Sequence, residues 1–382
     1  MKKMTRVIGI CAAAAMVITA VSPAFAEDEK FVIGAIGPQT GAAAAYGVSV
    51  MNGAELAVNE INEAGGINGY QVELITADDE HDAEKSVNAY NDLKDKGMQL
   101  LLGTVTSAPC IAVEGEAVSD NMFLLTPSGS SPDCITGENA FRVCFSDPAQ
   151  GNKSAEFIGT HELAEKVGII YDSSDPYSTG IMESFVAEAD NQGIEIVSNE
   201  AFSDNRTDFS AQLNKAKDGG AELVFLPFYY QEAALVLKQA SDMGFSPLFF
   251  GCDGMDGILT VENFDTSLAE GLMLLTPFTP NAEDEKTQDF VAAYEEAYDG
   301  LVPIQFGADA YDGIYAIKAA IEDAGVTPDM SISDICDGVK ASMGNITVEG
   351  LTGTITWDSA TGEPDKEPKA VVIENGEYVS KD

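Results

Sequence analysis

Short apolar runs alternate with segments of helical periodicity in the first part of this 382-residue chain. Each run is short enough for a buried strand and is bounded by polar or glycine-rich residues. The runs span residues 31–36, 72–75, 100–102 and 122–125. Between them, apolar residues recur on one helix face, as at 54, 57, 58 and 61. This regular alternation predicts a parallel sheet covered by helices.

The alternation restarts after Asp147-Pro148 and predicts a second α/β unit of similar size. Strands are expected at 167–171, 194–197, 223–228, 248–251 and 271–276. Helical segments at 290–297 and 310–323 follow, and strand-like runs at 353–357 and 370–373 close the chain. Asn375-Gly376 after the last run is a strong hairpin signal. The whole pattern predicts two α/β lobes with a groove between them.

Two of the predicted strands end in loops rich in small hydroxyl side chains. Residues 122–125 lead into Thr126-Pro127-Ser128-Gly129-Ser130, and residues 100–103 lead to Ser107 before Pro109. Ligands of open α/β sheets bind outside the carboxyl ends of the strands, and hydroxyls beside a helix N-terminus suit a carboxylate. Either loop alone is more typical of an ordinary connection with a serine cap. The two together favour a site for a small anion.

The first 26 residues have the pattern of a secretory signal peptide. A basic start precedes an alanine-rich apolar run at 7–21, and Ala24-Phe25-Ala26 forms a small-x-small cleavage site. The run is too short and wrongly flanked for a membrane span. We therefore expect export and cleavage after Ala26. The mature protein would lie in the periplasm or at the extracytoplasmic surface.

The charge of the chain limits its partners. Acidic residues outnumber basic residues 63 to 20, and the formal net charge is −43. The acidic residues are spread along predicted helices, so we interpret them as solvated surface. Nucleic acid is excluded as a partner because phosphate binding requires basic patches.

Cysteine usage fits an exported chain without a zinc site. Of the six cysteines, Cys11 lies in the signal peptide. Lipid attachment at Cys11 is the alternative to cleavage after Ala26, but Cys11 lies early in the apolar run and follows the large Ile10. The remaining number is odd, so at least one thiol is expected free, and no C-x-x-C spacing occurs. Cys110 and Cys134 follow the two loops and could form a bridge, although sequence does not fix connectivity.

Enzymatic motifs do not occur in the sequence. Its two histidines, His81 and His161, lie in polar surroundings more typical of solvated surface than of catalysis. The nucleophile-elbow, HExxH, P-loop and dinucleotide-binding glycine patterns are absent. The Asp253 and Asp256 pair fits no calcium loop. We therefore predict a protein with no catalytic activity, no cofactor and no metal.

A series of short motifs, taken in order, resembles one known family. The motifs are Ile33-Gly-Ala-Ile-Gly-Pro-Gln-Thr-Gly41, Tyr46-Gly47, Gly53-Ala-Glu-Leu-Ala57, Gly65-Gly-Ile-Asn-Gly69, Asp78-Asp79, Thr126-Pro-Ser-Gly-Ser130, Phe141-Arg142, Tyr177, Thr356-Trp-Asp358 and the closing hairpin. The family comprises the extracytoplasmic substrate-binding proteins of ABC importers for leucine, isoleucine, valine and related amino acids. The resemblance runs over essentially the whole mature chain, and the order and spacing of the motifs make it specific.

The resemblance implies the type I periplasmic-binding-protein fold, with two Rossmann-like α/β lobes, a central ligand cleft and a three-strand hinge. Each lobe is then discontinuous in sequence. The first lobe would contain residues 27–147 and 276–347, and the second would contain residues 148–275 and 348–382. Hinge motion would close the cleft around the ligand. The implied partners are a small amino acid and ABC permease subunits in the membrane, and we expect a monomer.

The resemblance also implies roles for individual residues. Ser107 and Ser130 match residues that hold an α-carboxylate, and Ser128 matches one whose carbonyl receives the α-ammonium. Asp253 matches a glutamate that pairs with that ammonium, and Tyr177 matches a tyrosine that reaches the same end. The matched wall around the ligand side chain consists of Tyr46, Val105, Tyr229 and Phe306. Without the resemblance, Asp253 is more typical of a turn, and Tyr229 of core or surface.

Two departures from the family pattern affect the ligand more than the fold. Asp253 is one methylene shorter than the usual glutamate, and a disulfide common in relatives falls on His81 and Thr106, where it cannot form. We predict delivery of an aliphatic amino acid, with branched-chain ligands expected first, to an ABC importer. The alternative is a sensing module of the same fold that binds another small carboxylate or amide and reports to a receptor. Such modules usually share their chain with a membrane span, and the sequence shows none.

Overall fold

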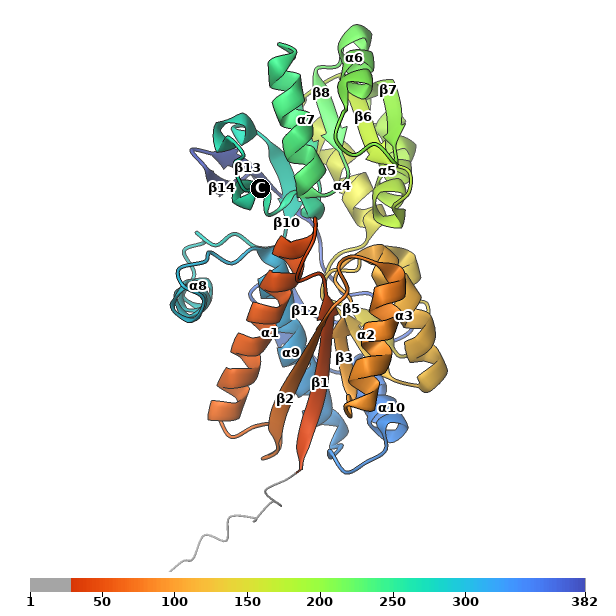
Figure 1. The fold of residues 1–382 in the computed structure, drawn as a ribbon, viewed down its shortest axis with the longest axis vertical. Helices are drawn as coiled ribbons and strands as arrows, with labels where there is room; N and C mark the ends of the chain where they lie inside the picture. The colour runs from red at the N-terminus through yellow and green to blue at the C-terminus, as the bar shows by residue number, and fades with distance from the viewer. Residues whose placement is uncertain (1–28, 382) are drawn as a thin grey trace, which may run out of the picture.

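The computed structural model describes residues 29–381. The predicted signal peptide, including Cys11, lies outside this range. Figure 1 shows two α/β lobes stacked along the long axis of the molecule. Within residues 29–381, no helix combines the length and the apolar character that a membrane crossing needs.

The first lobe is built on a five-stranded parallel sheet in the order β2-β1-β3-β4-β5. Its strands are β1 (Lys30–Gly37), β2 (Gln71–Asp78), β3 (Leu100–Gly103), β4 (Phe123–Thr126) and β5 (Ala140–Arg142). β3 and β4 are buried along their whole length, which explains their uninterrupted apolar sequence. Alternate residues face opposite sides of the sheet, so Leu102 and Leu101 belong to different core clusters.

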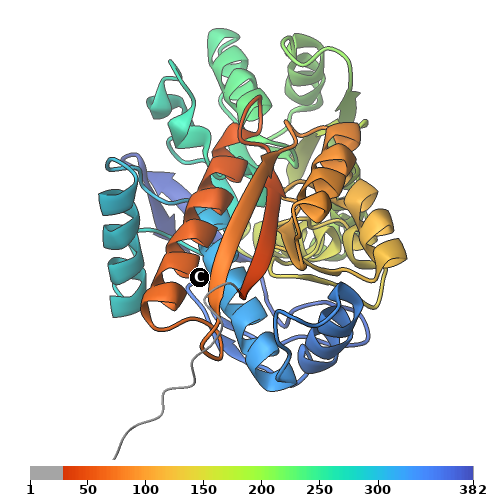
Figure 2. The ribbon, with the colours of Figure 1, turned by 60° about the horizontal axis from the view of Figure 1, so that its bottom comes forward.

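Helices cover both faces of this sheet (Figures 1 and 2). α1 (Ala44–Glu63) and α9 (Gln305–Ala324) share one apolar core with it, and α2 (Ala83–Asp95) and α3 (Ser107–Asp120) share another. α8 (Glu285–Ala297) packs against α1, and α10 (Ile332–Ser342) packs against α9. The sequence determines these helix starts locally: the Asp82 carboxylate, for example, caps α2 by accepting the N–H of Lys85 at 2.9 Å.

The second lobe contains a seven-stranded sheet in the order β14-β13-β10-β9-β8-β6-β7. Its parallel strands are β6 (Lys166–Asp172), β7 (Glu195–Phe202), β8 (Leu223–Leu226), β9 (Leu248–Gly251) and β10 (Met273–Thr276). Its antiparallel edge is formed by β13 (Lys369–Glu374) and β14 (Glu377–Ser380). Its helices are α4 (Asp147–Thr160), α5 (Pro176–Ala189), α6 (Ser210–Gly219) and α7 (Tyr230–Asp242). The predicted hairpin is confirmed, because Asn375 and Gly376 have the positive φ angles, 55° and 80°, that its two-residue turn requires.

Short elements complete the described chain, and one of them corrects a prediction. The 3₁₀ helices are η1 (Pro132–Ile135), η2 (Asp190–Gln192), η3 (Asp253–Met255), η4 (Ile258–Thr260) and η5 (Thr266–Ala269). The strand predicted at 353–357 is reduced to β12 (Thr354–Ile355), which pairs with β11 (Val348–Glu349) in a separate small sheet. Trp357, two residues beyond β12, is buried, and its indole N–H donates to the carbonyl of Arg142 at 2.7 Å.

The chain passes between the two sheets three times, as the resemblance implied. The passages follow β5, β10 and the β11–β12 hairpin. This hairpin packs on α9 of the first lobe, where the Asp312 carboxylate accepts the N–H groups of Leu351 at 2.8 Å and Thr352 at 2.9 Å. Our division of the lobes stays a proposal, and these contacts favour a third passage within 356–368 rather than at 348.

Two glycines allow α1 and α9 to approach closely. A Cβ at Gly53 would lie 2.1 Å from the carbonyl oxygen of Gly307, and a Cβ at Gly307 would lie 2.7 Å from the hydroxyl of Ser49. The side chain that glycine lacks would therefore force the two helices apart. This close approach also sets the separation of Tyr46 on α1 and Phe306 on α9, whose ring centroids are 4.3 Å apart.

We predict that Gly53→Ala lowers the free energy of unfolding by about 1–3 kcal/mol, because the added methyl group overpacks the contact between α1 and α9. The matched control is Gly115→Ala in α3, where an added Cβ meets nothing within 4 Å. In this control the free energy of unfolding should rise by about 0.5–1 kcal/mol, because alanine is favoured over glycine by that amount inside a helix. Urea unfolding of the mature protein measures both values. Equal stability of Gly53→Ala and wild type would contradict the prediction.

Candidate functional site

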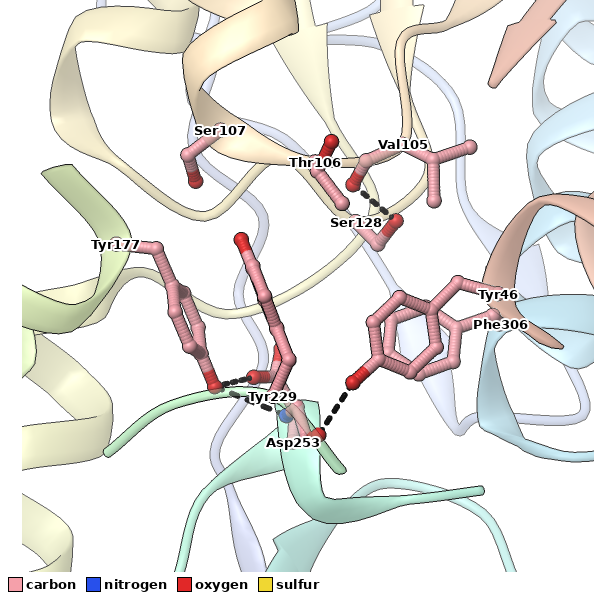
Figure 3. Close-up of a pocket in the computed structure, with 10 residues that line it drawn as sticks. Tyr46, Val105, Thr106, Ser107, Ser128, Tyr177, Tyr229, Asp253 and Phe306 are labelled. Carbon is pink, nitrogen blue, oxygen red and sulfur yellow. Dashed lines mark hydrogen bonds between the residues drawn. The ribbon is translucent and has the colours of Figure 1, made fainter. Parts of the chain in front are cut away.

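A small cavity lies between the two lobes (Figure 3). It is lined by Tyr46, Val105, Thr106, Ser107, Ser128, Tyr177, Tyr229, Asp253, Gly254 and Phe306. The structure thus brings together all the predicted site residues except Ser130, and adds Thr106 and Gly254. The volume of about 10 Å³ is roughly what one water molecule needs, so the lobes are closed on each other.

The first lobe contributes the ends of two neighbouring strands and the start of a helix. Val105 and Thr106 follow β3, and Ser107 is the first residue of α3, so free N–H groups of the first helical turn lie at the cavity. The Ser107 hydroxyl accepts the N–H of Ser131 at 3.2 Å. The Ser128 hydroxyl donates to the carbonyl of Val105 at 2.7 Å (Figure 3).

Ser130 lies behind the cavity wall rather than on it. Its hydroxyl is fully buried and has no hydrogen-bond partner within residues 29–381. Its loop is held by Arg142, a fully buried side chain that donates to the carbonyls of Gly129 at 3.2 Å, Ser131 at 3.1 Å and Ser130. The Phe141-Arg142 motif does not by itself assign Arg142 this role. A lone arginine within an apolar strand was the available signal.

The second lobe contributes one carboxylate, Asp253, at the carboxyl end of β9. Its carboxylate accepts a hydrogen bond from the Tyr177 hydroxyl at 2.6 Å. The Tyr177 oxygen in turn accepts a hydrogen bond from the N–H of Gly254 at 2.9 Å (Figure 3). Burial raises the pKa of Asp253 to about 7, although the hydrogen bond from Tyr177 works in the opposite direction. No basic side chain of the described chain forms an ion pair with Asp253. The cavity therefore presents an uncompensated acid.

Helix α4 adds further buried polar groups near this carboxylate that sequence reasoning missed. The Gln150 side-chain oxygen accepts the N–H of Asp253 at 3.0 Å. Asp147 is fully buried, and its carboxylate lies beside the buried Ser130 hydroxyl. Burial raises the pKa of Asp147 well above its ordinary value. Asp147 thus adds a second buried carboxyl group to the region, and neither Asp147 nor Gln150 supplies a positive charge.

Aromatic rings form the walls of the cavity. Tyr46 lies 4.3 Å from Phe306, and Tyr177 stacks on Tyr229 at 4.9 Å with an interplanar angle of 14°. Tyr46 also joins the lobes directly, because its hydroxyl donates to the carbonyl of Gly254 and accepts the N–H of Tyr230 at 3.3 Å. With its hydroxyl bonded to the backbone, Tyr46 presents mainly an apolar ring to a ligand.

Two sequence predictions near the site are wrong. Cys110 and Cys134 are both buried as free thiols, so the structure contains no bridge between them. His81 is not on solvated surface: its Nδ1 lies 2.8 Å from the Thr106 hydroxyl, and its ring packs on Tyr229. Both errors concern contacts between residues distant in sequence. His161, by contrast, is exposed as predicted.

Candidate metal ligands do not gather in the described chain. No group of three or more His, Cys, Asp or Glu side chains in residues 29–381 is arranged to hold a metal ion. The Asp256 carboxylate instead supports the backbone, because it accepts the N–H groups of Gly257 and Gln305, each at 2.9 Å.

Comparison with known proteins identifies the family. A model of the periplasmic binding protein family matches residues 30–377. This chain belongs to that family. The Leu/Ile/Val-binding protein homolog 3 of Brucella melitensis is 33% identical to it over 338 residues, which cover 87% of this chain and 88% of the relative.

Solved structures agree with the predicted fold class. This periplasmic binding protein is similar to the branched-chain amino acid transporter substrate binding protein of Streptococcus pneumoniae, which was solved with isoleucine. The TM-score is 0.84 and the identity is 28%, and the match covers 92% of this chain and 98% of that chain. A leucine binding protein of Thermotoga maritima has a TM-score of 0.82 and 27% identity over the same shares of the two chains. The type I periplasmic-binding-protein fold is thereby confirmed.

We predict that Asp253→Asn stabilises the ligand-free protein at alkaline pH. Asp253 has a pKa of about 7 in the folded state, against about 3.9 in an unfolded chain. The folded state therefore binds this proton more tightly, and wild-type stability falls as pH rises through that window. Asparagine does not titrate and escapes the loss. Its advantage in free energy of unfolding should be near zero at about pH 4 and about 2–4 kcal/mol at about pH 8.

Urea unfolding of ligand-free protein at the two pH values measures this advantage. The matched control is Asp242→Asn, which removes one negative charge from the exposed face of α7. The control should show the same difference from wild type at both pH values. An Asp253→Asn advantage that does not change with pH would contradict the prediction.

Proposed function

We propose that this periplasmic binding protein captures an amino acid in the cleft between its lobes and delivers it to an ABC importer. Branched-chain or other aliphatic amino acids are the ligands we expect. Relatives named as Leu/Ile/Val-binding proteins and structures solved with isoleucine and leucine support this proposal. The alternative, a sensing module for another small carboxylate or amide, has no comparable support.

The observation that carries the proposal is the opposite polarity of the two cavity walls. The second lobe presents Asp253, a buried carboxylate with no ion-pair partner in the described chain. The first lobe presents the start of α3, with the Ser107 hydroxyl and free N–H groups. A ligand with an ammonium at one side and a carboxylate at the other matches both walls.

The ammonium would lie between the Asp253 carboxylate and the carbonyl of Ser128. Two opposite charges about 4 Å apart gain roughly 4 kcal/mol at an effective dielectric constant near 20, and desolvation offsets part of that gain. Tyr177 holds the carboxylate in place by its hydrogen bond. Ionisation of Asp253, which burial disfavours, would be restored by the positive charge of the ligand.

The carboxylate would lie at the start of α3. The Ser107 hydroxyl and the N–H groups of the first helical turn can donate to it, and no full positive charge is needed there. The ligand side chain would then contact the wall formed by Tyr46, Val105, Tyr229 and Phe306. Rings and one valine suit an apolar side chain.

Ligand entry requires the lobes to separate. The closed cavity of about 10 Å³ has room for about one water molecule, which is far less than any amino acid occupies. Direct bonds between the lobes, such as that from Tyr46 to Gly254, would break on opening and be made again on closure. Hinge motion about the three chain passages would allow this exchange.

The cellular setting follows in part from the family. Periplasmic binding proteins act outside the cytoplasm as the binding components of transporters, and they are not enzymes. For this chain we propose the finer points: cleavage after Ala26, action as a monomer, contact with permease subunits of an ABC importer, and no catalytic activity.

We predict that mature protein, unfolded and refolded to remove bound ligand, releases or absorbs heat in calorimetric titration with leucine, isoleucine or valine. Asp253→Asn should weaken that binding by about tenfold or more, because the ammonium loses its charged partner. Asp242→Asn is the control and should bind as wild type does. No heat with any standard amino acid would refute the proposed ligand class, and unchanged affinity of Asp253→Asn would refute the role of Asp253.

A further inference from the structure

His81 lies where the first lobe meets the second at the edge of the cavity. It follows β2 in a tight turn, in which Glu80 and His81 have left-handed backbone angles, φ 51° and 60°. The Asp79 carboxylate accepts the N–H of His81 at 2.9 Å and fixes this turn. The Nδ1 of His81 lies 2.8 Å from the Thr106 hydroxyl, next to the start of α3. Its own lobe thus holds the backbone of His81 through Asp79 and its ring through Thr106.

The other side of the His81 ring contacts the opposite lobe. It packs edge to face on Tyr229, with centroids 5.4 Å apart and an interplanar angle of 89°. Tyr229 lines the cavity and stacks on Tyr177, the hydrogen-bond donor to Asp253. His81 therefore supports, from the first lobe, a wall of the cavity that belongs to the second lobe.

Charged groups face His81 from several elements. Its own lobe supplies Asp79 in the same turn and Asp82, the cap of α2. The second lobe supplies Asp172 at the end of β6 and Arg206 in the loop before α6, and Arg206 pairs with both Asp172 and Glu232 of α7. Burial lowers the pKa of His81, the Arg206 charge lowers it further, and Asp172 and Asp82 oppose these effects.

We propose that His81 is a positioning residue of the ligand site, whose neutral ring holds Tyr229 in the closed cleft and whose protonation favours the open cleft. This inference rests on the proposed function, because it assumes that an amino acid binds as the lobes close. When the lobes separate, Tyr229 and Arg206 move away from His81 and water reaches its ring. Its pKa then returns toward the ordinary value of about 6.5.

Ligand affinity should therefore fall as the solution is acidified. The open state takes up a proton near pH 6.5, while the closed state resists protonation to lower pH. Between about pH 7 and pH 5 this linkage can weaken binding by at most roughly 25-fold, and we expect about tenfold. His81 is a base whose pKa is lower in the closed state. Closure is therefore favoured above the open-state pKa and disfavoured below it.

Other groups titrate in the same range and must be separated from His81. Burial raises the pKa of Asp253 to about 7 and that of Asp79 also to about 7. Protonation of Asp253 would itself weaken binding of an ammonium. His81→Gln replaces the titratable imidazole with an amide that does not titrate and that can still bond to Thr106. His161→Gln is the matched control, since His161 is the other histidine of the chain and is exposed just after the end of α4.

The first test follows the imidazole protons by NMR during pH titration, with and without the amino acid that gives heat in calorimetry. Because the chain has 2 histidines, His81→Gln and His161→Gln assign both signals. We expect the ligand to lower the pKa of His81 and to leave the titration curve of the other imidazole signal where it was. An equal pKa of His81 with and without bound ligand overturns the inference, whether or not His81→Gln folds.

The second test compares the dissociation constant near pH 5 and near pH 7. The dissociation constant at about pH 5 divided by that at about pH 7 should be at least about threefold smaller for His81→Gln than for wild type. The same quotient should be unchanged for His161→Gln. If His81→Gln has the same quotient as wild type, the inference is overturned and the proposed function still stands. Absence of heat with every amino acid, in protein that unfolds cooperatively, overturns the proposed function and this inference with it.

Discussion

The cleft depends on one constraint: Asp253 is a carboxylate buried without a cation. Its neighbours are neutral: the Tyr177 hydroxyl donates to its carboxylate, and the Gln150 side-chain oxygen accepts its backbone N–H, so they orient the acid without neutralising it. Such a group is costly for the empty protein, because an ionised carboxylate away from water needs a partner. The cost is consistent with a site that is completed by a positive group from outside the chain, since functional sites often reduce the stability of the unliganded fold.

The two ends of the proposed site come from different lobes, so in our proposal recognition and closure are a single event. The start of α3 belongs to the first lobe and Asp253 to the second, and a bipolar ligand contacts both only when the cleft is closed. The supporting contacts are rigid. Arg142 holds the loop of Ser130, and the glycine contact between α1 and α9 places Tyr46 beside Phe306. Motion is thereby confined to the passages between lobes.

Much of the fold could be predicted from local pattern. β3 and β4 are uninterrupted apolar runs because helices cover both faces of their sheet, and Asn375-Gly376 specifies its hairpin by backbone preference alone. The predictions that failed were those that depend on distant partners. Trp357, beyond the shortened strand, bonds to the distant Arg142, Cys110 and Cys134 are thiols, and His81 is half-buried against Tyr229.

The sequence by itself determined the alternation of strands and helices, the hairpin, the serine-rich loops at two strand ends and, through its motifs, the family. Only the tertiary structure decided what those residues do together. Tyr177 and Asp253 are 76 residues apart in the chain and 2.6 Å apart in the fold. The pKa of Asp253 and the environment of His81 arise from burial and from neighbours in the other lobe. Such properties depend on the distance between side chains in space, which no local pattern of residues contains.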